Sequence, residues 1–113
     1  MISNSPIVYV VQDPDGKEIT LAKPFGKFYV ILTGKETVQQ AVYKLHKALV
    51  DFTDKDYLLP IGKSVNMGIA IHFAWEALKQ KDKQEPFVIL PTLKLLIWQR
   101  EQYAYIVEEI NAE

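Results

Sequence analysis

The sequence predicts an α/β fold: one domain with a mainly parallel sheet of four or five strands, two helices and a C-terminal β-hairpin. Uniformly apolar, β-branched runs are typical of buried strands, and two longer segments repeat apolar residues at helical spacing. These segments alternate along the chain, and strands joined through helices form parallel sheets with right-handed crossovers. The 113 residues suit a single domain, 1–113, in which 1–6 and 108–113 are expected to fray.

The first part of the chain predicts two strands and a helix. Apolar runs at Ile7–Val11 and Phe28–Leu32 indicate the strands, and Lys17–Leu21 between them fits either a short returning strand or a loop. Thr33–Glu36 has the spacing of a capping box, in which the Thr oxygen takes a free backbone N–H and Glu36 reaches back. It predicts the start of an amphipathic helix. The apolar face of that helix is Val38, Ala41, Val42, Leu45, Ala48, Leu49 and Phe52.

A third strand and a second helix follow. Tyr57–Ile61 is apolar, and Pro60, which lacks an N–H, should lie near the end of that strand. Ser64 is a natural N-cap for a helix from about Val65 to Lys79. A polar loop is expected from Gln80 to Glu85.

The C-terminal part predicts a hairpin. Leu93–Trp98 and Tyr103–Val107 are its strands, joined by a turn at Gln99–Gln102, and one of them should lie at a sheet edge. The short run 87–90 fits either a strand or a loop. Trp98, Tyr103 and Tyr105 can pair across the hairpin.

Composition and charge exclude several classes of protein. With 13 basic and 14 acidic residues the net charge is -1. Nucleic-acid binding is disfavoured, because the sequence has neither a basic excess nor a basic stripe. The chain has no cysteine, which excludes disulfides, zinc–thiolate sites and thiol nucleophiles. Met1–Pro6 is no signal peptide, and the apolar stretch Val65–Leu78 is too short to span a bilayer. We expect a soluble cytoplasmic protein with no membrane partner.

One loop is a candidate ligand site. Gly62, Lys63, Ser64 and Asn66 lie between a predicted strand and a predicted helix, where free N–H groups, the helix dipole and a lysine suit an anion such as phosphate. A Walker A loop would need a glycine where this chain has Tyr57, so that motif is absent. The alternative is an ordinary capped helix beside a solvated lysine.

No catalytic residue, cofactor or metal site is predicted. His72 and Glu76, four residues apart on the second helix, fit a general base with its carboxylate or an ordinary helical contact. His46 is expected to be surface decoration. Asp51, Asp54 and Asp56 fit a hard-cation site or a solvated turn, but the glycine and glutamate of an EF-hand loop are absent.

The second helix predicts self-association, because it is apolar almost all round. A sheet covers one stripe of a helix, and monomers rarely expose large apolar patches. We therefore expect a homodimer, the commonest oligomer, which a charge at an outward position such as Phe73 or Trp75 should split. The apolar residues of this second helix are Val65, Met67, Ile69, Ala70, Ile71, Phe73, Ala74, Trp75, Ala77 and Leu78.

Several segments together resemble a group of small bacteriophage α/β proteins. They are Val8–Gln12, Phe25-Gly26, Asp56–Val65 and Leu95–Trp98 with the aromatic strand that follows. The resemblance implies a phage or mobile-element origin, hence the host cytoplasm, and brings no catalytic residues. The leading expectation is a non-enzymatic interaction protein that acts on a host protein during infection. A binder of a phosphate-bearing ligand at Gly62–Asn66 is the alternative, and a small enzyme is the third.

Overall fold

The structure is a computed structural model that describes residues 5–82 and 92–111, and its centre is a five-stranded sheet of order β2-β1-β3-β4-β5. The pairs β2·β1, β1·β3 and β3·β4 are parallel, and β4·β5 is antiparallel. The predicted α/β class, with a C-terminal hairpin that ends at a sheet edge, is confirmed. The strands are β1 (Ile7–Gln12), β2 (Lys27–Leu32), β3 (Tyr57–Leu59), β4 (Thr92–Gln99) and β5 (Ala104–Asn111).

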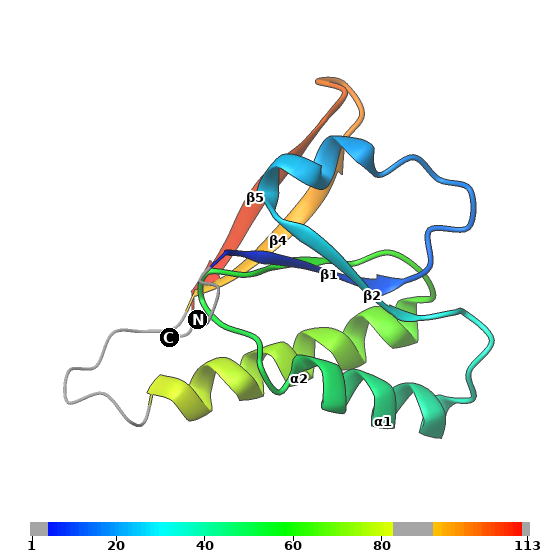
Figure 1. The fold of residues 1–113 in the computed structure, drawn as a ribbon, viewed down its shortest axis with the longest axis vertical. Coiled ribbons are helices and arrows are strands. Elements are labelled where there is room, and N and C mark those ends of the chain that lie inside the picture. Colours follow the sequence, from blue (N-terminus) through cyan, green and yellow to red (C-terminus); the bar gives the residue numbers. More distant parts are fainter. Residues whose placement is uncertain (1–4, 83–91, 112–113) are drawn as a thin grey trace.

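The two faces of the sheet are covered unequally (Figure 1). Helices α1 (Val38–Leu49) and α2 (Ser64–Asp82) lie on one face and bury the larger core with it. The 3-10 helix η1 (Thr20–Phe25) lies on the other face, over a smaller core. Right-handed crossovers explain this division, because the chain moves one way along the sheet from β1 to β2 and the other way from β2 to β3 to β4.

Helix α1 begins later than the sequence predicts. Thr37 is its N-cap: the Thr37 hydroxyl accepts from the Gln40 N–H at 3.1 Å, and Gln40 Oε1 accepts from the Thr37 N–H at 3.0 Å. The capping box predicted at Thr33–Glu36 is therefore wrong by four residues. The apolar face is also narrower than predicted, because one sheet face covers only a limited stripe. Val38 and Val42 are exposed, whereas the other positions of the predicted face are buried.

One open alternative before α1 and two boundaries of α2 are settled by the structure. The Lys17–Leu21 segment forms no strand, and η1 begins at Thr20 with Ala22 buried against the sheet. At the start of α2 the Lys63 carbonyl accepts from the Met67 N–H at 3.0 Å, so Lys63 takes the capping position expected for Ser64. The polar loop expected from Gln80 starts later, because α2 extends to Asp82; the rest of that loop and 87–90 lie outside the described residues.

Strand β5 continues where a frayed tail is expected. Glu108 lies opposite Leu95 and Glu109 opposite Lys94, and the pairing runs on to Asn111 opposite Thr92. The pairing with β4 along the whole strand orders this acidic segment. The hairpin strand therefore runs beyond its predicted end at Val107, and Ala112 and Glu113 lie outside the described residues.

Candidate functional site

The carboxyl ends of β1 and β3 lie side by side, and the chain leaves the two strands toward opposite faces of the sheet. From β1 the chain passes to η1 on one face of the sheet, whereas from β3 it passes to α2 on the other (Figure 1). Open α/β sheets bind ligands in the crevice that such diverging connections leave, and the strand order 2-1-3-4-5 puts it between β1 and β3. The predicted site residues, Gly62, Lys63, Ser64 and Asn66, follow β3 and therefore lie at this crevice.

The side chain of Gln12, the last residue of β1, lies across the crevice. Its Oε1 accepts hydrogen bonds from the Lys63 backbone N–H at 3.2 Å and from Asn66 Nδ2 at 3.0 Å. Asn66 is only 4% exposed, so its amide serves a buried contact. Gln12 thus places a neutral oxygen on an N–H that a bound anion would use at the start of a helix.

Two glycines allow Gln12 to take this position. Gly62 has a φ of +119°, and a Cβ there would lie 2.4 Å from Gln12 Oε1. On the other side a Cβ at Gly34, which follows β2, would lie 2.9 Å from Gln12 Nε2. Gln12 therefore lies between the loops that leave β2 and β3, and it hydrogen-bonds to the loop and helix that follow β3. Sequence reasoning missed Gln12; its signal was a polar residue ending an apolar strand.

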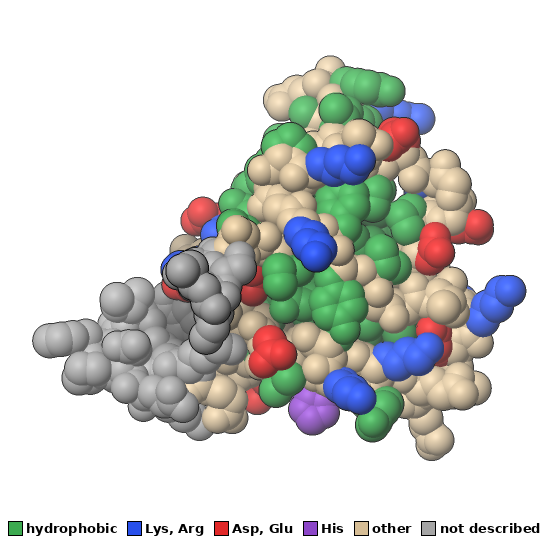
Figure 2. Space-filling model, viewed as in Figure 1, with side chains coloured by type: hydrophobic (Ala, Val, Ile, Leu, Met, Phe, Trp, Pro, Cys, Tyr) green, Lys and Arg blue, Asp and Glu red, His purple; other side chains and the backbone are tan. Residues whose placement is uncertain are grey.

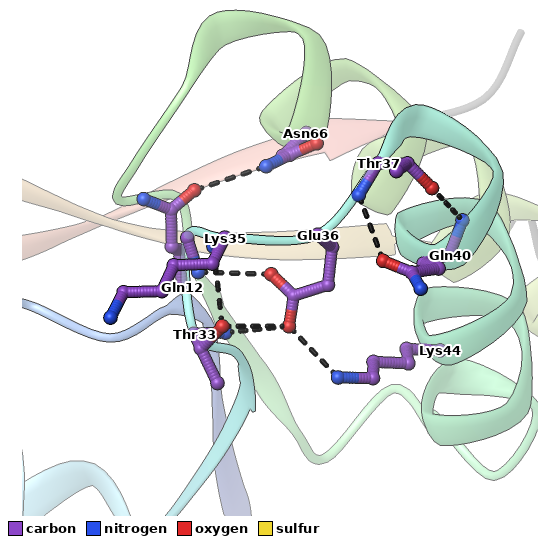
Figure 3. A network of polar contacts seen from close by, with 9 residues as sticks. Gln12, Thr33, Lys35, Glu36, Thr37, Gln40, Lys44 and Asn66 are labelled. Atoms are coloured by element: carbon purple, nitrogen blue, oxygen red, sulfur yellow. Dashed lines mark hydrogen bonds and ion pairs between the residues drawn. The ribbon is translucent and has the colours of Figure 1, made fainter.

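Glu36 forms the centre of a second polar cluster (Figure 3). Its carboxylate accepts from the backbone N–H groups of Thr33 and Gly34, both at 2.9 Å, from the Thr33 hydroxyl at 3.1 Å and from Lys44 Nζ at 2.9 Å. Desolvation of the buried side chain, which is 3% exposed, opposes ionisation, but these hydrogen bonds outweigh it and hold the pKa of Glu36 well below its ordinary value. Glu36 therefore has a structural role, because its carboxylate joins the loop before α1 to Lys44 of that helix.

The loop after α1 repeats the arrangement of the loop before it. In Thr53–Asp56, as in Thr33–Glu36, the acid three residues on accepts from the threonine N–H, here at 2.9 Å, and from its hydroxyl, here at 3.0 Å. Asp56 also accepts from the Ile7 N–H at 2.9 Å, which ties this loop to β1. Asp56 therefore has a structural role. Among the residues described, Asp51, Asp54 and Asp56 form no group that could hold a metal ion.

The two histidines lie on different helices and make different contacts. His72 and Glu76 are both exposed on α2, and the hydrogen bonds within the described part of the chain include none between them. His46 is more than surface decoration, because it stacks on Phe73 of α2 with ring centroids 4.7 Å apart. The predicted packing role of the hairpin aromatics is confirmed: Trp98 meets Tyr103 and Tyr105 edge-on, with centroids 5.2 and 5.1 Å apart.

The most unusual surface is the open edge of the sheet at β2. Figure 2 shows hydrophobic side chains gathered over this part of the molecule, with lysine and arginine side chains spaced around them. Tyr29 is 46% exposed and Val30 is 42% exposed, and they are consecutive residues of one strand. Lys23 and Lys27 next to them are also exposed. Within residues 5–82 and 92–111, β2 is thus an apolar strand that no other strand pairs with on its outer side.

Comparison with known proteins adds the family. A family model described as Phage Pam3 gp32-like protein matches residues 6–112, which include every strand and helix described above. The chain belongs to the Phage Pam3 gp32-like protein family. The predicted resemblance to phage proteins is thereby confirmed. The comparisons with curated proteins and with solved structures found no match. Within 5–82 and 92–111, no helix is long and apolar enough to cross a membrane.

Proposed function

We propose that this member of the Phage Pam3 gp32-like protein family is a non-enzymatic interaction protein that acts inside the infected host cell. It binds a protein partner by strand pairing at the open edge of β2. The observation that carries the proposal is the exposure of Tyr29 and Val30 on an edge strand. Such an edge presents unpaired N–H and C=O groups, and extended segments bind to edges of this kind by adding a strand.

The sequence of β2 is that of a strand buried on both faces. Phe28–Leu32 is apolar without a break, a pattern typical of the inner strands of parallel sheets. Natural proteins protect exposed edges with charges, bulges or prolines, and apart from Lys27 at its start β2 has none of these. The opposite edge, β5, carries Glu108 and Glu109 in its second half. A covered state for β2 accounts for the lack of such protection along this strand.

Binding of a phosphate-bearing ligand at Gly62–Asn66 is the second candidate. Its support is the position of this loop at the crevice between β1 and β3. It ranks second because Gln12 Oε1 already accepts from the Lys63 N–H and from Asn66. A thermal-shift titration with inorganic phosphate tests it. A rise in the melting temperature that Lys63→Glu abolishes supports the ligand site, and no shift counts against it.

A matched pair of variants tests the leading proposal. Val30→Lys places a charge on the open edge of β2, and Val65→Lys places the same charge on α2 at a residue of similar exposure, 51%. Both are used with the wild type in affinity capture from infected host cells. We expect a partner that the wild type and the Val65 variant retain and the Val30 variant loses.

Hydrogen exchange locates the contact on the same samples. The amides of β2 should gain protection when the captured partner is added to the wild type. Capture that is equal for all three chains, or protection confined to other elements, would contradict the proposal.

A further inference from the structure

We infer that the strand that pairs with β2 is β5 of a second copy of this chain, so that copies join head to tail into a continuous sheet. The inference rests on the proposed function, since it names the partner of the same edge. The two strands are the two edges of the sheet that the described residues form, and they differ in charge. Lys27 begins β2 and Lys23 lies close before it in the chain, whereas Glu108 and Glu109 lie in β5.

The direction of the strands allows this contact. The first four strands of the sheet order are mutually parallel and β5 is antiparallel to them. A second copy placed beside the first in the same orientation therefore presents its β2 antiparallel to β5. Antiparallel pairing is the more stable kind per residue. In both copies α1 and α2 then lie on one face of the extended sheet, and η1 lies on the other face.

One register matches side chains on both faces. On the helix side, Tyr29 packs against Tyr9 of the larger core, and Ile106 pairs with Ile97 beside that core. Alternation along each strand then sorts the remaining residues by face. Setting Tyr29 opposite Ile106 yields five pairs. They are Lys27 with Glu108, Phe28 with Val107, Tyr29 with Ile106, Val30 with Tyr105, and Ile31 with Ala104.

Each of these pairs joins like faces and compatible chemistry. Phe28, Val107 and Tyr105 all pack beside the smaller core, so they belong to the η1 side. Lys27 and Glu108 are both exposed and of opposite charge, which favours the pair when they lie directly opposite each other. The apolar half of β5 thus covers β2, and the acidic residue lies at the basic end.

A two-fold pairing of β2 with itself explains less. With like faces together and Val30 at the axis, Lys27 would lie opposite Thr33 and no acidic residue would meet it. It would also leave the apolar half of β5 open. The head-to-tail contact covers both edges and places opposite charges together. Contacts of this type form rings or open filaments.

Light scattering on the purified full-length chain tests the inference. For the wild type we expect a mass that rises with concentration from 13.0 kDa through the dimer to larger species. Val30→Lys blocks β2 and Glu108→Lys blocks β5, and each variant alone should stay monomeric with an unchanged circular dichroism spectrum. Mixed one to one, the two variants should form a heterodimer and nothing larger, because one complementary pair of edges remains.

A charge exchange provides the second measurement. Lys27→Glu alone should weaken association at least tenfold, and Lys27→Glu with Glu108→Lys in one chain should restore it. Val65→Lys should associate like the wild type.

Four results would overturn the inference. They are a wild type that stays at 13.0 kDa at every concentration, a mass that stops at a dimer, a mixture of the blocked chains that stays monomeric, and association that only Val65→Lys abolishes. A monomeric wild type whose captured partner is lost in Val30→Lys leaves the proposed function intact while the head-to-tail contact fails. Equal capture by all variants defeats the proposed function itself.

Discussion

Glu36 is a buried carboxylate whose ionised form stabilises the fold through hydrogen bonds. Because its folded-state pKa is lowered, the stabilisation is fully present above the pKa of the unfolded chain, near 4.5, and is lost as the pH falls toward the folded-state value. At neutral pH, Glu36→Gln should lower the free energy of unfolding by about 1.5–3 kcal/mol, the range for hydrogen bonds to a charged group. Urea denaturation at neutral pH and in acid measures it, and the difference from wild type should shrink in acid. The exposed Glu76→Gln is the control, and an equal loss in both variants would contradict the prediction.

Gly62 is required for a close approach as well as for its backbone conformation. Gly16 separates these two effects, because it also has a positive φ, +88°, but a Cβ there would meet nothing within 4 Å. Gly16→Ala should cost about 1 kcal/mol for the left-handed conformation alone. Gly62→Ala should cost about 2–4 kcal/mol, since it must also displace Gln12. Thermal denaturation of both variants gives the comparison, and equal losses would show that Gln12 yields without cost.

Helix α1 has two threonines before it that could cap it, and only one does. Thr37→Ala should lower the free energy of unfolding by about 1 kcal/mol and fray the first turn, because the Gln40 N–H loses its acceptor. Thr33→Ala should destabilise the chain without fraying α1, because its hydroxyl serves the loop around Glu36. Hydrogen exchange at the first-turn amides distinguishes them. First-turn exchange that accelerates in Thr33→Ala instead would mean that the observed cap is not the one that matters.

At this scale the sequence predicts the strands and both α-helices, and it places the starts of β1 and β3 correctly, but it misplaces the start of α1 and the end of β5. Apolar periodicity identifies both helices and the strands, since it records which side chains are buried. It misplaces the start of α1 because Thr33–Glu36 and Thr37–Gln40 have the same spacing and only the fold decides which one caps the helix. It misses the end of β5 because the glutamates Glu108 and Glu109 give no apolar signal, although β4 pairs with them.

The candidate site is predicted only in part for a related reason. The loop Gly62–Asn66 is recognisable because its glycine, lysine and helix start are adjacent in the sequence. Its main partner, Gln12, lies 54 residues before Asn66 and reaches it only because β1 and β3 are neighbours in the sheet. Strand order cannot be read from a local pattern, so a contact between two strand ends stays hidden until the sheet is known. The same holds for the open edge of β2, whose sequence predicts an inner strand.

Glu36 and Tyr9, whose pKa values are shifted in opposite directions, act at opposite ends of the pH range in which the fold is stable. Glu36 acts at the acid end, as argued above. At the alkaline end, burial first, and then the nearby charge of Asp56, raises the pKa of Tyr9 to about 12. Tyr9 packs between Tyr29 and Phe52, with ring centroids 5.5 and 5.4 Å away, so its ionised form would have to enter the larger core.

The sign of the alkaline effect follows from the direction of that shift. The folded chain holds the Tyr9 proton more tightly than the unfolded chain, whose tyrosines titrate near 10. Stability is therefore full below pH 10 and is lost as the pH rises toward 12. We expect the free energy of unfolding to fall over this interval, and Tyr9→Phe to make the fall shallower. Tyr105, whose pKa is raised by burial and then by Glu18, contributes to the same loss, so some slope should remain. Urea denaturation in steps from pH 9 upward measures the free energy of unfolding, and ultraviolet titration of the phenols follows their ionisation. An unchanged slope in Tyr9→Phe would show that Tyr9 ionises without leaving the core.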